Sequence, residues 1–276
     1  MSPDDYKALP VPPLPPTQCL NTTTFTQPKL DGSLSVPELY DWHLEHSPNH
    51  PLFVFSDEQG ISTTIYWPEA ARAVHRAGHL VRSLVQDDTS KTAQPSKPRV
   101  LAVLAATDSV TFFTLLVGVM RAGHTVFPIS PRNSAQAVAH LLTKTNATHL
   151  FVGPEVAFQD LAAASLKVIS SSGGSVPALA AMPSFEELYV KDSAKNFVPL
   201  PPVKPEWDSA AVIMHSSGST AFPKPIVWTH YRYLLLSIVP YLGERDLTSQ
   251  RLACHSLPMY HGMGIMQTGW TVRARS

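Results

Sequence analysis

The feature that most constrains this fold is an alternation of strand and helix patterns that runs without a break from Arg99 to Gly153. Each strand pattern is almost entirely apolar, so both of its faces are expected to be buried. Strands joined by helices lie parallel, because a crossover through a helix returns the chain to the same end of the sheet. The sequence therefore predicts an α/β fold of stacked βα units, with a parallel sheet covered by helices on both faces.

Local signals place the elements of these units. Asp108 or Ser109 is predicted to cap the first helix, and Gly123 is predicted to end it. A second helix is predicted from Ser134 to Thr145. The predicted strands are VLAVLA, HTVFPIS and THLFVG, and a smaller βα unit is predicted to pass through LKVIS.

The segments on either side have their own patterns. Residues 1–30 are rich in Pro and Thr and have little apolar periodicity, which predicts a disordered lead-in. Residues 31–276 are predicted to form one domain, which starts with a helix at Val36, two strands in LFVFS and ISTTIYW, and a helix opened by Pro68. Residues 171–205 contain SSGGS and several prolines, and we expect a long connection there.

Composition narrows the class of protein. With 276 residues and 44% hydrophobic residues, the chain has enough apolar material for a buried core. The 21 basic and 21 acidic residues give a net charge of +0, so neither a nucleic acid nor a membrane is predicted as a partner. Two cysteines are too few for a disulfide framework, and the acidic, proline-rich start does not fit a signal peptide. These features predict a cytoplasmic protein.

The chemistry is concentrated in residues 215–230, HSSGSTAFPKPIVWTH, which follow the buried strand pattern SAAVIMHS. Small residues allow several backbone N–H groups to converge on a polyphosphate, and hydroxyl groups add further donors. Lys224 supplies a compact positive charge on a flexible stem, and Pro223 and Pro225 stiffen its approach. The segment is therefore interpreted as a phosphate-binding loop.

A Ser/Gly-rich surface turn is the alternative, because short motifs often match by chance. The string SSGGS at 171–175 is such a case; it lacks a lysine and a Thr-His end, so it is assigned to a linker. The prolines around Lys224 do not fit the G-x-x-x-x-G-K-[ST] pattern of an ordinary P-loop hydrolase. No G-x-S-x-G motif is present, so Ser217 and Ser219 are poor candidates for a hydrolase nucleophile.

The string SSGSTAFPKPIVWTH resembles the phosphate-binding signature of the acyl-adenylate-forming (AMP-binding) superfamily, which includes acyl-CoA synthetases, luciferases and nonribosomal peptide synthetase adenylation domains. Three further stretches occur in the family's order: IYWPEA, MRAGHTVFPISP and LPMYHGMG. Pro225 and Ile226 after the lysine, with Thr229 and His230 at the end, are most similar to fungal synthetase-like carboxylic acid reductases. Those proteins couple adenylation, carrier and reductase domains.

The resemblance implies a two-step ligase reaction. A carboxylate attacks the α-phosphate of Mg-ATP, pyrophosphate leaves, and a thiol then captures the acyl-adenylate. ATP, AMP and Mg²⁺ are therefore the expected cofactors. In a full-length enzyme the thiol is expected to be carrier-protein phosphopantetheine or CoA, with a carboxylic acid as substrate and carrier and reductase domains as partners. Such phosphoryl chemistry requires that the reactants are positioned and that the negative charge of the phosphates is neutralised.

By the same resemblance, particular residues take roles, and none of them is assigned to catalysis itself. Ser216 occupies the position of a hydroxyl near the metal. Ala221 departs from the usual Gly, and a positive φ there would introduce strain. His261 is expected beside AMP; the alternative is a structural His at a strand end, with glycines forming a turn. The nucleotide-binding set is Ser216, Ser217, Gly218, Ser219, Thr220, Ala221, Lys224 and His261, and the substrate-binding set is Tyr260, His261 and Gly262.

The resemblance covers about residues 36–270. The family's acidic motif, ribose-binding aspartate, hinge and C-terminal lid with its lysine have no counterpart in the sequence. A partial adenylation domain that is inactive alone is therefore expected, as a fragment of a longer enzyme. The alternative function is a catalytically inactive nucleotide-binding or interaction fragment.

Overall fold

The structure is a computed structural model, and it describes residues 17, 19–56, 59–85, 97–191, 195, 197–216, 222–248, 250 and 257–274. All structural statements below concern this part of the chain. None of its helices is long and apolar enough to cross a membrane.

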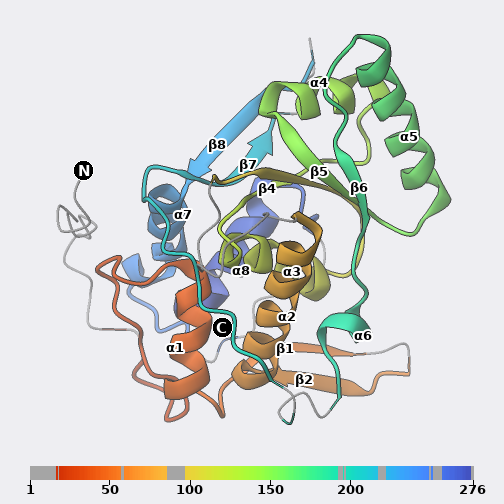
Figure 1. The fold of residues 1–276 in the computed structure, drawn as a ribbon. Helices are drawn as coiled ribbons and strands as arrows, with labels where there is room; N and C mark the ends of the chain where they lie inside the picture. The colour runs from red at the N-terminus through yellow and green to blue at the C-terminus, as the bar shows by residue number, and fades with distance from the viewer. Residues whose placement is uncertain are drawn as a thin grey trace.

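A six-stranded sheet forms the centre of the fold, with the strand order β6-β5-β3-β4-β7-β8 (Figure 1). The strands from β6 to β7 are parallel, and β8 is antiparallel to β7. Strands β3 and β4 thus lie at the centre of the sheet, and the strands that follow them in the chain lie on either side. Its strands are β3 (Val100–Leu104), β4 (Thr125–Pro128), β5 (Ala147–Val152), β6 (Ala178–Ala181), β7 (Ala210–His215) and β8 (Pro225–Thr229).

Helices cover both faces of this sheet (Figure 1). Along β3, Leu101 and Val103 belong to one buried cluster, and Ala102 and Leu104 belong to another. This alternation follows from the two-residue period of a strand, and it confirms the predicted fold class. The first cluster contains α1 (Val36–His46), α2 (Trp67–Val85), α3 (Ser109–Arg121), α7 (His230–Ser237) and α8 (Gly262–Ala274); the second contains α4 (Ala135–Thr145) and α5 (Val156–Ser171).

The predicted helix ends of the central units are confirmed. The Asp108 carboxylate accepts a hydrogen bond from the Thr111 N–H at 2.8 Å and so caps α3. Gly123 follows the helix with a φ of 84°, a conformation that glycine adopts without strain. Ser134 lies one residue before α4, where its hydroxyl accepts a hydrogen bond from the Ala137 N–H.

A smaller antiparallel sheet precedes these units. It pairs β1 (Pro51–Ser56) with β2 (Ser62–Tyr66) and leads directly into α2. Pro68 lies in the first turn of α2, as predicted, because its missing N–H has no helical partner at that position. Helix α1 begins after Ser35, at the predicted Val36.

The prediction of a βα unit through LKVIS is wrong, because these residues belong to α5. Ala162, Ser165 and Ile169 are the buried positions of that helix, and their spacing is helical. The next strand is β6, inside the segment predicted as a connection. Its sequence, ALAA, lacks the β-branched and aromatic residues that signal a strand, and a short helix, α6 (Phe185–Leu188), follows it.

Residues 17 and 19–30, within the range of the predicted lead-in, contact later parts of the chain. The backbone N–H of Cys19 donates to the Thr248 hydroxyl at 2.9 Å, and the N–H of Leu20 donates to the Asp246 carboxylate at 2.9 Å. Thr26 makes two hydrogen bonds near the end of α1, to the Ser47 hydroxyl and the His46 carbonyl. These contacts join the segment to the end of α1 and to the region around residues 246–248.

Candidate phosphate-binding site

The predicted phosphate loop connects β7 to β8, and two hydrogen bonds fix its base. The Ser216 N–H donates to the Lys224 carbonyl at 3.0 Å, and the Lys224 N–H donates to the Ser216 hydroxyl oxygen at 3.0 Å. The register of the two strands pairs His215 with Pro225 directly below this point. The two residues at which the chain enters and leaves the loop are therefore held together.

The tip of the loop, residues 217–221, lies outside the described residues. The roles expected for the residues of this tip thus remain predictions, as does the strain expected at one of them. They are Ser217, Gly218, Ser219, Thr220 and Ala221.

Lys224 is exposed, and its ammonium makes no hydrogen bond or ion pair with the residues that the structure describes. Its charge is therefore available to an anion in solution. The Ser216 hydroxyl accepts one hydrogen bond and keeps its own proton and a second lone pair. That oxygen fits a Mg²⁺ ion, which commonly binds few protein oxygens together with substrate phosphates and water.

Two residues in front of Lys224 anchor the loop to its surroundings. Pro223 is buried. Phe222 is 52% exposed, but its ring stacks on the His140 ring of α4, with centroids 5.1 Å apart and planes inclined by 17°. The sequence gives no signal for this contact, because three strands and two helices lie between α4 and the loop along the chain.

The Thr-His end of the signature has a structural role. The Thr229 hydroxyl accepts a hydrogen bond from the Arg232 N–H at 3.2 Å and so caps α7. His230 is 6% exposed, and burial lowers the pKa of its imidazole to about 4. Thr229 therefore caps the helix that follows β8, and His230 is the buried first residue of that helix.

His261 lies immediately before α8. Its backbone N–H donates to the Pro258 carbonyl at 2.9 Å, and its Nδ1 accepts a hydrogen bond from the Met263 N–H at 3.4 Å. The side chain is exposed, and the neutral ring has Nε2–H as the group left for a ligand. Gly262 and Gly264 belong to the first turn of the helix, so the alternative of a His at a strand end followed by a glycine turn is wrong.

The structure brings the LPMYHGMG motif next to the strand that follows the loop. A Cβ atom added at Gly262 would lie 3.5 Å from the Trp228 ring of β8. Tyr260 is half-buried at the same turn. The sequence reasoning missed this proximity of Trp228 to the turn, although Trp228 lies within the signature itself.

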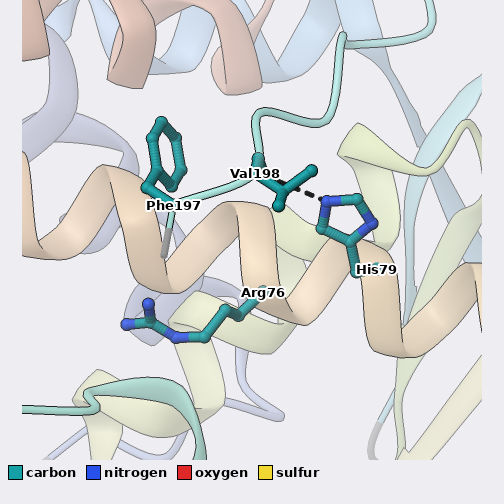
Figure 2. Close-up of a pocket in the computed structure, with 4 residues that line it drawn as sticks. All are labelled: Arg76, His79, Phe197 and Val198. Atoms are coloured by element: carbon teal, nitrogen blue, oxygen red, sulfur yellow. Dashed lines mark hydrogen bonds between the residues drawn. The ribbon is translucent and has the colours of Figure 1, made fainter. Parts of the chain in front are cut away.

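Figure 2 shows a separate open pocket of about 370 Å³, lined by Arg76, His79, Phe197 and Val198. The His79 Nε2 donates to the Val198 carbonyl at 3.1 Å. The Arg76 guanidinium points away from the His79 ring and donates to the Leu188 carbonyl at 2.6 Å. This pocket lies on α2 and contains none of the predicted site residues.

A mostly parallel α/β sheet whose strands β7 and β8 are joined by a Ser/Gly/Lys loop, with the LPMYHGMG turn against Trp228 of β8, is typical of proteins that bind phosphate groups. The chain belongs to the AMP-binding enzyme family, which it matches over residues 41–275. The resemblance inferred from the four motifs is therefore confirmed.

Among curated relatives, the adenylate-forming reductase Nps10 of Heterobasidion annosum is 47% identical over 271 residues, which are 95% of this chain and 24% of that protein. The adenylate-forming reductase Nps11 of Serpula lacrymans is 34% identical, over 88% of this chain and 22% of that protein. The similarity to fungal reductases is thus confirmed as well. The chain spans about a quarter of the length of these relatives.

Solved structures share the fold. The luciferase-like enzyme of the mealworm Zophobas morio has a TM-score of 0.64 at 18% identity, covering 95% of this chain and 56% of that one. The adenylation domain of a carboxylate reductase from Mycobacterium chelonae has a TM-score of 0.60 at 16% identity, covering 88% of this chain and 42% of that one.

Proposed function

We propose that this chain forms the ATP-binding part of a site that activates a carboxylic acid as its acyl-adenylate. The observation that supports this most directly is the loop base, where Ser216 and Lys224 are joined by two hydrogen bonds and the lysine side chain is left exposed. A family of AMP-binding enzymes uses the fold that carries it.

In the proposed reaction, a carboxylate oxygen forms a bond to the α-phosphorus of ATP, and the bond from that phosphorus to the bridging oxygen of pyrophosphate breaks. Negative charge grows on the departing pyrophosphate. Lys224 would bind its oxygens and stabilise that charge, and the backbone N–H groups of the loop would add to the effect. When bound, Mg²⁺ would neutralise phosphate charge beside the Ser216 hydroxyl.

The turn of Tyr260, His261 and Gly262 would form the side of the site nearer the acid. Gly262 lies against Trp228, near the end of β8 farther from the loop, and the exposed His261 ring offers an N–H to a phosphate or carboxylate oxygen.

Transfer of the acyl group to a thiol is the expected second step. An acyl-adenylate is a mixed anhydride that a thiolate attacks readily, and phosphopantetheine or CoA would supply that thiol. Carrier and reductase domains in a longer protein are the proposed partners, because relatives of this chain are named adenylate-forming reductases.

Acid-dependent exchange of pyrophosphate into ATP tests the proposal, and it is measured on a longer protein in which this chain is part of an adenylation domain. We expect the exchange rate to fall roughly a hundredfold in Lys224→Ala, the size of effect seen when one charge-stabilising donor is removed from an active site. Lys204→Ala is the matched control, because Lys204 is exposed and lies outside the loop. Equal exchange by the wild type and Lys224→Ala would contradict the role given to this lysine.

A nucleotide-binding protein without catalytic activity of its own is the second candidate, because the exposed Lys224 at the loop base could bind phosphate whether or not the reaction follows. Calorimetry with MgATP separates the two candidates. Binding that depends on Lys224, without exchange, favours the second candidate, whereas binding with exchange favours the adenylation site. A chain that does not bind MgATP at all would contradict both.

A further inference from the structure

We propose that His215 is a positioning residue of the phosphate loop, which it ties to the neighbouring strand β4 through one particular tautomer of its imidazole. The inference rests on the proposed function and adds a residue to which the sequence signature assigns no role. It concerns how the loop is held, and His215 itself need not touch the nucleotide.

Two hydrogen bonds define the position of the His215 ring. Its Nε2 accepts from the Ser130 backbone N–H at 3.0 Å, and its Nδ1 is 2.9 Å from the Ser216 carbonyl oxygen. A carbonyl can only accept, so Nδ1 must carry the proton. Because Nε2 accepts from an N–H group, it must be unprotonated. The geometry therefore selects the neutral Nδ1–H tautomer.

The Ser130 N–H needs this partner because of the way β4 and β7 separate. The two strands pair at Val126 and Val212. Beyond β4, the Ile129 N–H still donates to the Val103 carbonyl of β3 at 2.8 Å, so the next N–H, from Ser130, faces β7. There β7 ends at His215, where the chain enters the loop, and the imidazole takes the place of a backbone acceptor.

The His215 ring also helps to hold Ser216 in place. The Ser216 N–H and hydroxyl are both bonded to the backbone of Lys224, and its carbonyl accepts from His215. Phe127 of β4 meets the imidazole edge-on, with centroids 6.3 Å apart and planes at 75°. A continuous series of contacts thus runs from β4 through His215 and Ser216 to Lys224.

Three substitutions separate the contributions of the two ring nitrogens. His215→Asn keeps a polar group near the position of Nδ1, His215→Gln keeps one near the position of Nε2, and His215→Phe keeps the ring shape but neither hydrogen bond. We expect His215→Phe to raise the Kd for MgATP about tenfold, which matches the loss of one to two net hydrogen bonds. Asparagine and glutamine should each recover part of this loss.

The matched control is His149→Gln, which replaces a buried histidine on β5 of the same sheet, away from the loop. It should bind MgATP like the wild type. Urea unfolding of every variant would show that binding is compared between folded proteins. In the exchange assay, His215→Phe should raise the KM for ATP more than it lowers kcat, since its effect is on loop geometry before the chemical step.

Nitrogen chemical shifts of the His215 ring, measured by NMR on the chain without nucleotide, test the tautomer independently of activity. A protonated Nδ1 and an unprotonated Nε2 are expected, and the reverse tautomer would overturn the proposal. Unchanged MgATP binding by His215→Phe, alongside weakened binding by Lys224→Ala, would overturn it too while leaving the proposed function intact. Absence of MgATP binding by the wild type would instead remove the proposed function, and this inference with it.

Discussion

At the scale of single residues, the tightest constraint in the core is Gly118, where α3 crosses α2. A Cβ atom at this position would lie 2.4 Å from the Ala77 Cβ and 3.0 Å from the Gly78 backbone nitrogen. Neither neighbour is the end of a flexible side chain, so the helices themselves would have to move apart. The absence of a side chain at Gly118 thus sets the distance between α2 and α3.

We therefore expect Gly118→Ala to lower the free energy of unfolding by about 1–3 kcal/mol, as overpacked cores do. Urea denaturation measures this change. Gly243→Ala serves as the control, because the nearest atom to a Cβ at Gly243 is 3.8 Å away and its φ is not positive. A loss of stability as large in Gly243→Ala as in Gly118→Ala would contradict the argument.

At the scale of elements, a closed ring of hydrogen bonds ties α1, α2 and α3 to the segment before β7. The Leu200 N–H donates to His75 Nδ1 at 2.7 Å, and His75 Nε2 is 3.0 Å from the Asp41 carboxylate. Arg121 donates to the same carboxylate at 2.9 Å and to the Leu200 carbonyl at 2.6 Å, which closes the ring. His75 must be neutral here, since Nδ1 accepts.

This ring predicts a pH dependence of stability. Burial, together with the Arg121 charge, lowers the pKa of His75 despite its bond to Asp41. The contribution of His75 is therefore complete above its unfolded pKa of about 6.5 and is lost as the pH falls below that value. At a pH near 8, the free energy of unfolding of His75→Phe should be about 2 kcal/mol lower than that of the wild type, because the substitution removes the acceptor of the Leu200 N–H.

The stability difference between the wild type and His75→Phe should narrow as the pH is lowered through the histidine range in urea titrations. His46→Phe is the control, because His46 is exposed on α1 and lies outside the ring. A difference that stays constant with pH would show that His75 does not contribute through its neutral form.

The sequence predicts elements whose signals are local. The units from β3 to β5 combine apolar runs with the cap Asp108 and the terminal Gly123, so they could be located before the structure was known. Strand β6 could not, because its alanines carry no strand preference and its pairing with β5 decides its conformation. The strand order is likewise a property of long-range pairing.

The same division applies to the candidate site. Ser216 and Lys224 are found from the signature, because spacing along the chain fixes them at the loop base. The bridge from His215 to Ser130 joins residues 85 positions apart, and the stack of Phe222 on His140 joins two separate elements. Contacts of this kind depend on how β4, α4 and β7 come together, which no local pattern encodes.

At the scale of the whole molecule, the fold places the loop at one edge of a mixed sheet. The edge strand β8 has exposed apolar side chains, with Ile226 at 46% and Val227 at 43%. The chain spans about a quarter of the reductases it matches, so the activity of a longer protein would combine this part with others. The contribution that we propose for this chain is the phosphate end of the nucleotide site.

The central claim is that the chain helps to join a carboxylate oxygen to the α-phosphorus of ATP. The most direct test incubates MgATP, an acyl acceptor thiol and a carboxylic acid labelled with heavy oxygen, and then measures the label in AMP by mass spectrometry. The account predicts AMP that carries one heavy oxygen from the acid, in an amount that falls in Lys224→Ala. Unlabelled AMP, or ADP and phosphate as the products, would contradict it.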